Sequence, residues 1–289
     1  MTTPEFLTTK EVAGMLRVKE RKVYDMVAEG GIPHRRITGK LLFPRAELEA
    51  WLSGKAVTST SAPNVIAGSH DPLLDWAIRQ SGSGLATLFD GSMDGIDRLV
   101  SGDAGAAGMH VYEPETGDWN LGVVKDRVGA APVVLIEWAK RQQGLIVAPD
   151  LAGVISRFAD LAGRRVAMRQ DKAGAAVLFN HLLGKAGFSS DDLRIIPEIA
   201  RTETEAAAAI AAGQADVAPG LEAAARQFGL GFVPTMIERF DLAIERRLWF
   251  EAPFQQLLAF AQSQKFSAKA VELGGYDISQ IGRVVWNGP

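Results

Sequence analysis

Residues 6–52 read FLTTKEVAGMLRVKERKVYDMVAEGGIPHRRITGKLLFPRAELEAWL, and this stretch decides the fold of the N-terminal part of the chain. Thr8 and Glu11 have the spacing of a capping box, which predicts a helix that begins near Thr9. Arg17 and the residue after it then form a short turn. The stretch therefore begins with one short helix followed directly by a turn.

A second helix follows, because Val23, Met26 and Val27 recur at helical spacing and share one apolar face. Glycines at positions 30 and 31 are expected to end it, since glycine tolerates the left-handed backbone conformation found after helices. Pro33 has no amide N–H and prevents the helix from continuing.

The next residues predict a hairpin and a closing helix. Residues 34–37 and 41–43 form two extended arms around the turn 38–40, and the hairpin is rich in positive charge. Pro44 suits the first turn of a last helix, whose residues Leu48 and Trp51 face the core. The order is helix, turn, helix, basic hairpin, helix.

A small domain with this order of elements can place its second helix in the major groove of DNA. Cations of the hairpin, or wing, would contact phosphates, which position a protein without specifying sequence. An exposed charge can equally be a solvated surface group, and Tyr24 can pack against the protein. The candidate DNA contacts are Thr9, Lys19, Arg21, Lys22, Tyr24, Arg35, Arg36 and Lys40.

The N-terminal domain, residues 1–52, resembles the excisionase-type, MerR-like winged helix-turn-helix family. The resemblance rests on the runs LTTKEVA (7–13), VY (23–24), GIP (31–33), GKLLF (39–43) and residues 48–51. It implies binding to a double-stranded DNA operator. Lys19 stands where many relatives have a capping serine.

Composition limits the remaining possibilities. The chain has 289 residues, 47% of them hydrophobic, and no cysteine, which excludes disulfides and cysteine-based sites. Residues 1–55 carry 10 Lys+Arg against 7 Asp+Glu, so the net charge of -3 combines about +3 here with about -6 elsewhere. We found no apolar run long enough to span a membrane and no signal pattern, so a cytoplasmic protein without a membrane partner is expected.

Residues 53–63 are small and polar and predict a linker to a second domain, residues 64–289. In that domain short apolar runs alternate with amphipathic helices, which predicts an α/β fold with mostly parallel sheets. Its length favours two lobes. The expected strands are 65–67, 85–89, 104–109, 133–136, 145–147, 165–168, 193–196, 216–219 and 240–244.

Three turns of this domain, 67–71, 89–95 and 169–174, each follow a predicted strand and open a helix. Small residues such as Ser69 and Ser92 let a ligand approach the backbone, and helix N-termini favour an anion. Ordinary strand–helix turns use the same residue types. Asp71 is either a helix cap or a ligand contact.

Residues 64–289 resemble a type II periplasmic-binding-protein-like domain of the kind fused to helix-turn-helix modules. The resemblance rests on the runs GSHD (68–71), GS (91–92), AGMH (107–110), GDWN (117–120), RQQGL (141–145), RQ (169–170), GQAD (213–216) and FVP (232–234), together with Glu238, Asp241 and Leu242. It implies lobe I at about 64–137 and 242–289, lobe II at about 138–241, and hinge crossings near 137–141 and 238–242. The implied ligand contacts are Ser69, His70, Ser92, Trp119, Arg169, Gln170 and Gly174.

Relatives of this kind are similar to molybdate and tungstate binders, which implies an oxyanion or a small carboxylate as ligand. They carry a Gly-Ser-Gly-Thr-Arg run where this chain has Lys172-Ala173-Gly174-Ala175-Ala176. The lost hydroxyls and arginine leave open a different ligand, weaker binding or a pocket that no longer binds. Arg169 can supply a cationic donor for an anion or form an ion pair within the protein.

These observations predict a one-component transcriptional regulator, a homodimer whose C-terminal clamp senses a small anionic effector. Neither an enzyme motif nor a cofactor motif is present, so we expect no catalysis and no cofactor. The alternative is an architectural or recombination-type DNA-binding factor whose large domain contacts proteins. A polar crevice between the lobes favours sensing, and a filled apolar one favours the alternative.

Overall fold

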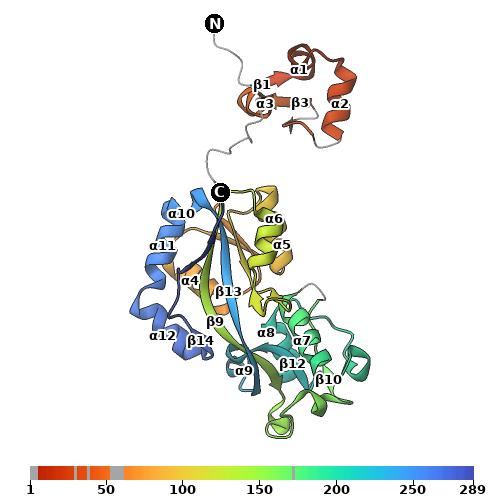
Figure 1. Ribbon diagram of the computed structural model, residues 1–289, viewed down its shortest axis with the longest axis vertical. Helices are drawn as coiled ribbons and strands as arrows, with labels where there is room; N and C mark the ends of the chain where they lie inside the picture. Colours follow the sequence, from red (N-terminus) through yellow and green to blue (C-terminus); the bar gives the residue numbers. More distant parts are fainter. Residues whose placement is uncertain (1–5, 29–30, 38–39, 53–61, 171–172) are drawn as a thin grey trace. The chain divides into compact units, whose positions relative to one another are not determined.

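The structure is a computed structural model that describes residues 6–28, 31–37, 40–52, 62–170 and 173–289. The chain divides into two compact units, residues 1–61 and 62–289, and each is described by itself (Figure 1). Most of the predicted linker, along with Gly30 and the 38–39 turn, lies outside the described residues. In the described part of the chain, none of the helices combines the length and apolar character needed to cross a membrane.

The N-terminal unit packs three helices on a three-stranded antiparallel sheet of order β1-β3-β2. Val12 of the first helix, Val23 of the second and Phe43 of the sheet are fully buried in its core. The elements are β1 (Phe6–Thr8), α1 (Thr9–Leu16), α2 (Glu20–Ala28), β2 (Arg35–Ile37), β3 (Lys40–Pro44) and α3 (Arg45–Leu52).

The predicted capping box is confirmed. The hydroxyl of Thr8 accepts a hydrogen bond from the amide of Glu11, and the Glu11 carboxylate accepts one from the amide of Thr8 at 2.7 Å. α1 ends at Arg17, which adopts the left-handed conformation with φ 54°. The short strand β1 before the helix was not predicted, and it pairs with β3.

The larger unit is an α/β domain built around one sheet (Figure 1). Its first half comprises β4 (Val65–Gly68), α4 (Pro72–Ser81), β5 (Ala86–Phe89), α5 (Ser92–Ser101), β6 (Ala106–Met109), β7 (Tyr112–Glu113), β8 (Asp118–Trp119), α6 (Leu121–Val128) and β9 (Val133–Val147). Its second half comprises β10 (Arg165–Val166), α7 (Gly174–Lys185), β11 (Arg194–Ile195), α8 (Glu203–Ala211), β12 (Val217–Leu221), α9 (Glu222–Gln227), β13 (Gly231–Glu245), α10 (Arg246–Phe250), α11 (Ala252–Ala261), α12 (Gln264–Leu273), β14 (Tyr276–Asp277) and β15 (Val284–Asn287).

The sheet has the order β11-β10-β12-β9-β13-β6-β4-β5, and β14 and β15 also pair with β9. The strand pairs at each end of the sheet are parallel, as predicted, but the central pairs β12–β9, β9–β13 and β13–β6 are antiparallel. The long strands β9 and β13 pair along their whole length and run through both lobes. They connect the lobes as a two-stranded hinge.

Two predicted strands, 133–136 and 145–147, are therefore one strand, and the predicted strand 240–244 is the end of a longer one. The polar run from Lys140 to Gln143 interrupts the apolar pattern and conceals the continuity. Within the fold Arg141 and Gln143 are buried and hydrogen-bonded, which makes polar residues acceptable in the middle of a strand.

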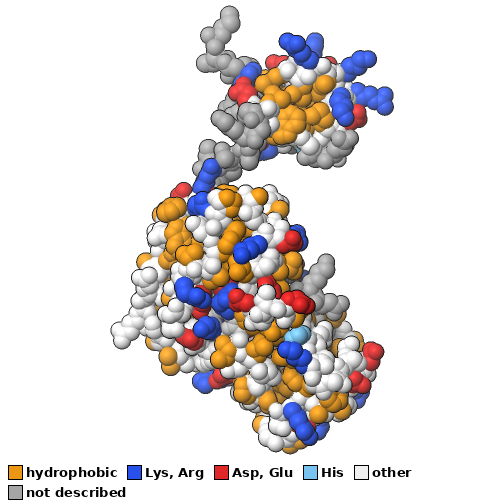
Figure 2. Space-filling view, in the orientation of Figure 1, with side chains coloured by type: hydrophobic (Ala, Val, Ile, Leu, Met, Phe, Trp, Pro, Cys, Tyr) orange, Lys and Arg blue, Asp and Glu red, His pale blue; other side chains and the backbone are white. Residues whose placement is uncertain are grey.

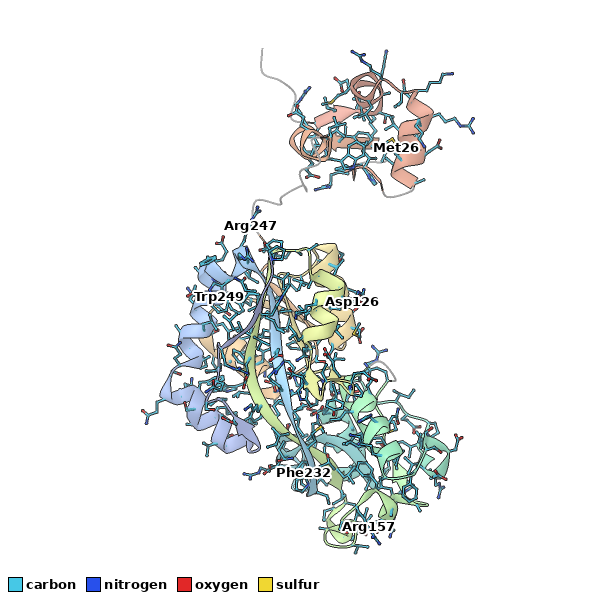
Figure 3. The ribbon with its side chains drawn as sticks, viewed as in Figure 1. Met26, Asp126, Arg157, Phe232, Arg247 and Trp249 are labelled. Carbon is cyan, nitrogen blue, oxygen red and sulfur yellow. The ribbon has the colours of Figure 1, made fainter. Side chains whose placement is uncertain are left out.

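Each lobe has its own apolar core. In lobe I, Trp138, Phe254 and Phe266 are fully buried, and Trp249 packs against them. In lobe II, Ile146 is buried in a cluster against which Phe232 packs. Trp249 on α10 and Phe232 on β13 mark the two lobes in Figure 3. The predicted two-lobe α/β architecture is confirmed.

Candidate ligand site and nucleic-acid interface

The exposed face of α2 and the turn before it carry positive charge. Lys19, Arg21 and Lys22 are exposed to solvent, and Tyr24 is 51% exposed. The opposite face of α2 buries Val23, so the helical periodicity places core residues and surface residues on different faces. The predicted contact Thr9 is instead buried in the first turn of α1. This face offers cations for a phosphate backbone.

The wing contributes fewer free cations than its composition indicates. Arg35 donates to Glu47 of α3 at 2.7 Å, an ion pair that is half-exposed. Lys40 is exposed at the start of β3. The side chain of Arg36 lies outside the described residues.

In lobe I, the residues after three strand ends form a buried polar cluster that faces lobe II, and we call it the serine corner. Ser69 follows β4, Ser92 opens α5, and His110 follows β6. The two serine hydroxyls are 2.8 Å apart, and the Ser92 hydroxyl accepts a hydrogen bond from the amide of His110 at 3.2 Å. All three residues are buried. The structure thus brings together two serines that are 23 residues apart in sequence.

Lobe II meets this corner through the first residue of α7, Gly174. A Cβ atom on Gly174 would lie 2.7 Å from the His110 carbonyl oxygen and 3.0 Å from its ring, so only glycine fits. Among the described residues, no side chain caps the N-terminus of α5 or of α7. Two helix N-termini without a side-chain cap among the described residues therefore lie close to His110, where they favour an anion.

Arg169 and Gln170 lie in lobe II. Arg169 is 7% exposed and donates to the carbonyl of Arg201 at 2.6 Å. Burial lowers the pKa of its guanidinium, and the charges of Glu203 and Glu205 oppose that effect. Among the described residues, the hydrogen bonds of Arg169 stay within lobe II and do not reach the serine corner.

The other two predicted contacts border separate cavities. His70 helps to line an interlobe cavity of about 600 Å³ with Trp76 of α4 and Arg226 of α9. Trp119 packs against Tyr112 with ring centroids 5.1 Å apart and lines a different cavity over the hinge.

A buried ionic network at the base of the crevice was not predicted. Arg141 of β9 donates to Asp71 at 2.9 Å and forms an ion pair with Glu238 of β13. Glu238 also bonds His110 at 2.8 Å, and the hydroxyl of Tyr276 donates to Asp71 at 2.7 Å. Asp71 uses its other oxygen to cap α4, so its predicted capping role is confirmed.

Attraction between opposite charges keeps Arg141 and Glu238 of this network ionised. Burial opposes ionisation of Glu238, but the charges of Arg141 and His110 outweigh it and lower its pKa to about 2. Burial likewise opposes the charge of Arg141, but Glu238 and Asp71 raise its pKa. Gln143 extends the network into lobe II by donating to Glu203 at 3.1 Å. Residues of both lobes and of the hinge are thus joined through one set of polar contacts.

The chain combines a helix-turn-helix unit with a two-lobed α/β domain. This combination defines the class of binding-protein-like domains that are coupled to a helix-turn-helix module. A PBP superfamily domain model matches residues 75–262, and a helix-turn-helix domain model matches residues 6–56. The chain belongs to the PBP superfamily.

The chain is also similar to other proteins and to solved structures. The Bacillus subtilis (strain 168) protein YvgK is 25% identical over 300 residues, covering 96% of this chain and 97% of that protein. A Clostridium pasteurianum protein from the 5′ region of a 2Fe-2S ferredoxin gene is 34% identical over 80 residues, 27% of this chain and 71% of that protein. Corynebacterium glutamicum OxyR, solved as a cysteine-to-serine mutant with H2O2 bound, is 14% identical with a TM-score of 0.51, covering 92% of this chain and 89% of that one. The last likeness concerns the fold alone.

Proposed function

We propose that this protein is a one-component DNA-binding regulator whose two-lobed domain senses a small anionic ligand. The observation that carries the proposal is the serine corner, where the hydroxyls of Ser69 and Ser92 and two uncapped helix N-termini converge on His110. Hydroxyls and backbone amides are the donors that bind an oxyanion or a carboxylate without a counter-charge. Buried hydroxyls and helix N-termini that meet where the two lobes pack together support sensing over a purely architectural role.

The helix-turn-helix unit, which we place with the excisionase-type and MerR-like readers, supplies the output. Its exposed cations on α2 suit a DNA backbone, and a homodimer would present two such units to a palindromic operator. Ligand binding must favour one arrangement of the lobes over another to change operator affinity. The crevice binds its ligand without transforming it.

Thermal unfolding of the full-length protein with molybdate, tungstate, sulfate, acetate and malonate tests the ligand. A binder present at 100 times its Kd stabilises the folded state by about 2.7 kcal/mol, which raises the Tm measurably. The Ser92→Ala variant should lose that rise, because it removes a hydroxyl from the corner. A Tm unchanged by the whole panel argues against an anionic ligand of this size.

A further inference from the structure

A second cavity lies outside the crevice, on the outer face of the hinge. It has a volume of about 700 Å³ and is lined by residues of β9, β13 and β14, with contributions from β8 and α9. Pockets for small molecules typically measure about 300–1,000 Å³. Charged side chains of both signs gather over the middle of β9 and β13 in Figure 2. The cavity is large enough for an organic molecule.

The hinge strands form the floor of this cavity, and Arg141, Glu238 and Tyr276 of the ionic network are also among its lining residues. Glu238 and Tyr276 are both paired in register with Arg141, and these three side chains form the crevice network. In the adjacent rung, Arg239 and Asp277 are paired with Lys140. Successive side chains of a strand point to opposite faces, so the second rung faces the outer cavity.

The carboxylates of the cavity wall already have partners. Asp118 accepts from Arg239 at 2.7 Å, Glu222 accepts from Arg226 at 2.8 Å, and Asp277 accepts from the amide of Ser279 at 2.9 Å. An incoming cation would compete with these partners. The wall therefore offers little to a positively charged ligand.

The cations of the wall are not all engaged. Within the described ranges, half-buried Lys140 makes no hydrogen bond and no ion pair, although its charge helps to lower the pKa of the neighbouring Asp277 carboxyl. Arg283 uses Nε and Nη2 for Glu137 and keeps Nη1 for another partner. Ile237, which is 61% exposed, adds an apolar wall beside them. An ammonium that has no hydrogen-bonded partner, next to an exposed aliphatic side chain, matches an anion that carries an apolar group.

We propose that the hinge cavity is a second ligand site, which binds a small organic anion with an apolar body. The anionic group contacts Lys140 and Arg283, and the apolar body covers Ile237. A molecule bound there touches the same strands that carry the crevice network on their other face. The site is separate from the serine corner and does not depend on it.

Fluorescence titration of the full-length protein with 8-anilinonaphthalene-1-sulfonate, an anion with an apolar body, tests the site. Lys140→Met should weaken binding roughly tenfold, since a charge-assisted contact is lost, and Lys140→Arg should retain it. Ile237→Asn should also weaken binding. Hexanoate should displace the probe and hexanol should not.

Matched variants separate this site from other surfaces. Lys125→Met removes an exposed lysine of α6 and should leave binding unchanged. Phe250, which is 74% exposed, borders a different, apolar cavity, and Phe250→Ser should also have no effect. Equal affinity of wild type and Lys140→Met, or loss of binding in Phe250→Ser, would overturn the proposal.

Discussion

Arg141 and Glu238 are cross-strand neighbours at the middle of the hinge, and their side chains form an ion pair with almost no access to solvent. Each also reaches one residue of lobe I, Asp71 from Arg141 and His110 from Glu238. Breaking one member of such a group leaves an uncompensated buried charge. The pair therefore links the hinge to the crevice wall.

Arg141→Met should destabilise the protein by about 3–5 kcal/mol, because Asp71 and Glu238 lose their counter-charge. The double variant Arg141→Met with Glu238→Met should cost less than the single one, since it removes one of the stranded carboxylates. Denaturant unfolding at pH 7 measures both. Arg98→Gln, which breaks an exposed pair with Asp94, is the control and should change little. A double variant at least as unstable as Arg141→Met would contradict the coupling.

Asp241 should give the stability a pH dependence of its own. Burial raises its pKa to about 6, against the charge of Arg239 and the hydrogen bond from Asn120. Because the folded pKa exceeds the unfolded value of 3.8, its contribution is full below that value and is lost as the pH rises through 6.

The Asp241→Asn variant has no carboxyl that titrates at this position. The free energy of unfolding of the wild type, minus that of the variant, should therefore fall by up to about 3 kcal/mol between pH 4 and 7. Urea unfolding at several pH values measures it. Asp216→Asn is the control: its hydrogen bond from Arg165 lowers the Asp216 pKa, so that difference should stay flat over the same range. A flat difference for Asp241→Asn as well would refute the raised pKa.

Gly174→Ala should force the two walls of the crevice apart, because the added methyl group meets the carbonyl and ring of His110. Overpacking of this kind costs about 1–3 kcal/mol and should also weaken ligand binding. Gly184→Ala on the same helix has open space around it and should stabilise the protein by about 0.5–1 kcal/mol. Chemical unfolding distinguishes the two. If both glycines behave alike, the lobes do not meet at Gly174.

Arg21→Ala should weaken DNA binding and lower its dependence on salt, since each phosphate contact contributes about 0.9 to the slope of log K against log salt. Fluorescence anisotropy with a duplex selected by the wild-type protein gives both quantities. Arg157→Ala, a 78% exposed arginine of the larger unit, serves as the control and should leave both unchanged. An unchanged slope for Arg21→Ala would remove α2 from the interface.

Much of the fold is readable from local sequence signals. The capping box at Thr8 and Glu11 lies within four residues, and the apolar spacing of Val23, Met26 and Val27 marks α2. Both are local, so no tertiary contact is needed to interpret them. The strands and turns that bring Ser69 and Ser92 to one corner follow from the same kind of pattern.

The ionic network could not be predicted in this way. Arg141 lies 70 residues from Asp71, and His110 lies 128 residues from Glu238, so only the tertiary fold brings them together. The polar run from Lys140 to Gln143 also hides the continuity of β9. Polar residues are acceptable in a buried strand when they have hydrogen-bond partners, and the partners of this run lie far away in the sequence. A long apolar run that is interrupted at its centre by charged residues is the sequence signal that could have indicated a hinge strand.

The effect of a bound anion on operator affinity tests the central claim most directly. Anisotropy titrations of the full-length protein with its selected duplex would be repeated with molybdate, tungstate, sulfate, acetate and malonate. We expect at least one of them to change the operator Kd by about 5- to 150-fold, and Ser92→Ala to abolish the change. The same operator Kd with every anion, together with no thermal stabilisation, would contradict it.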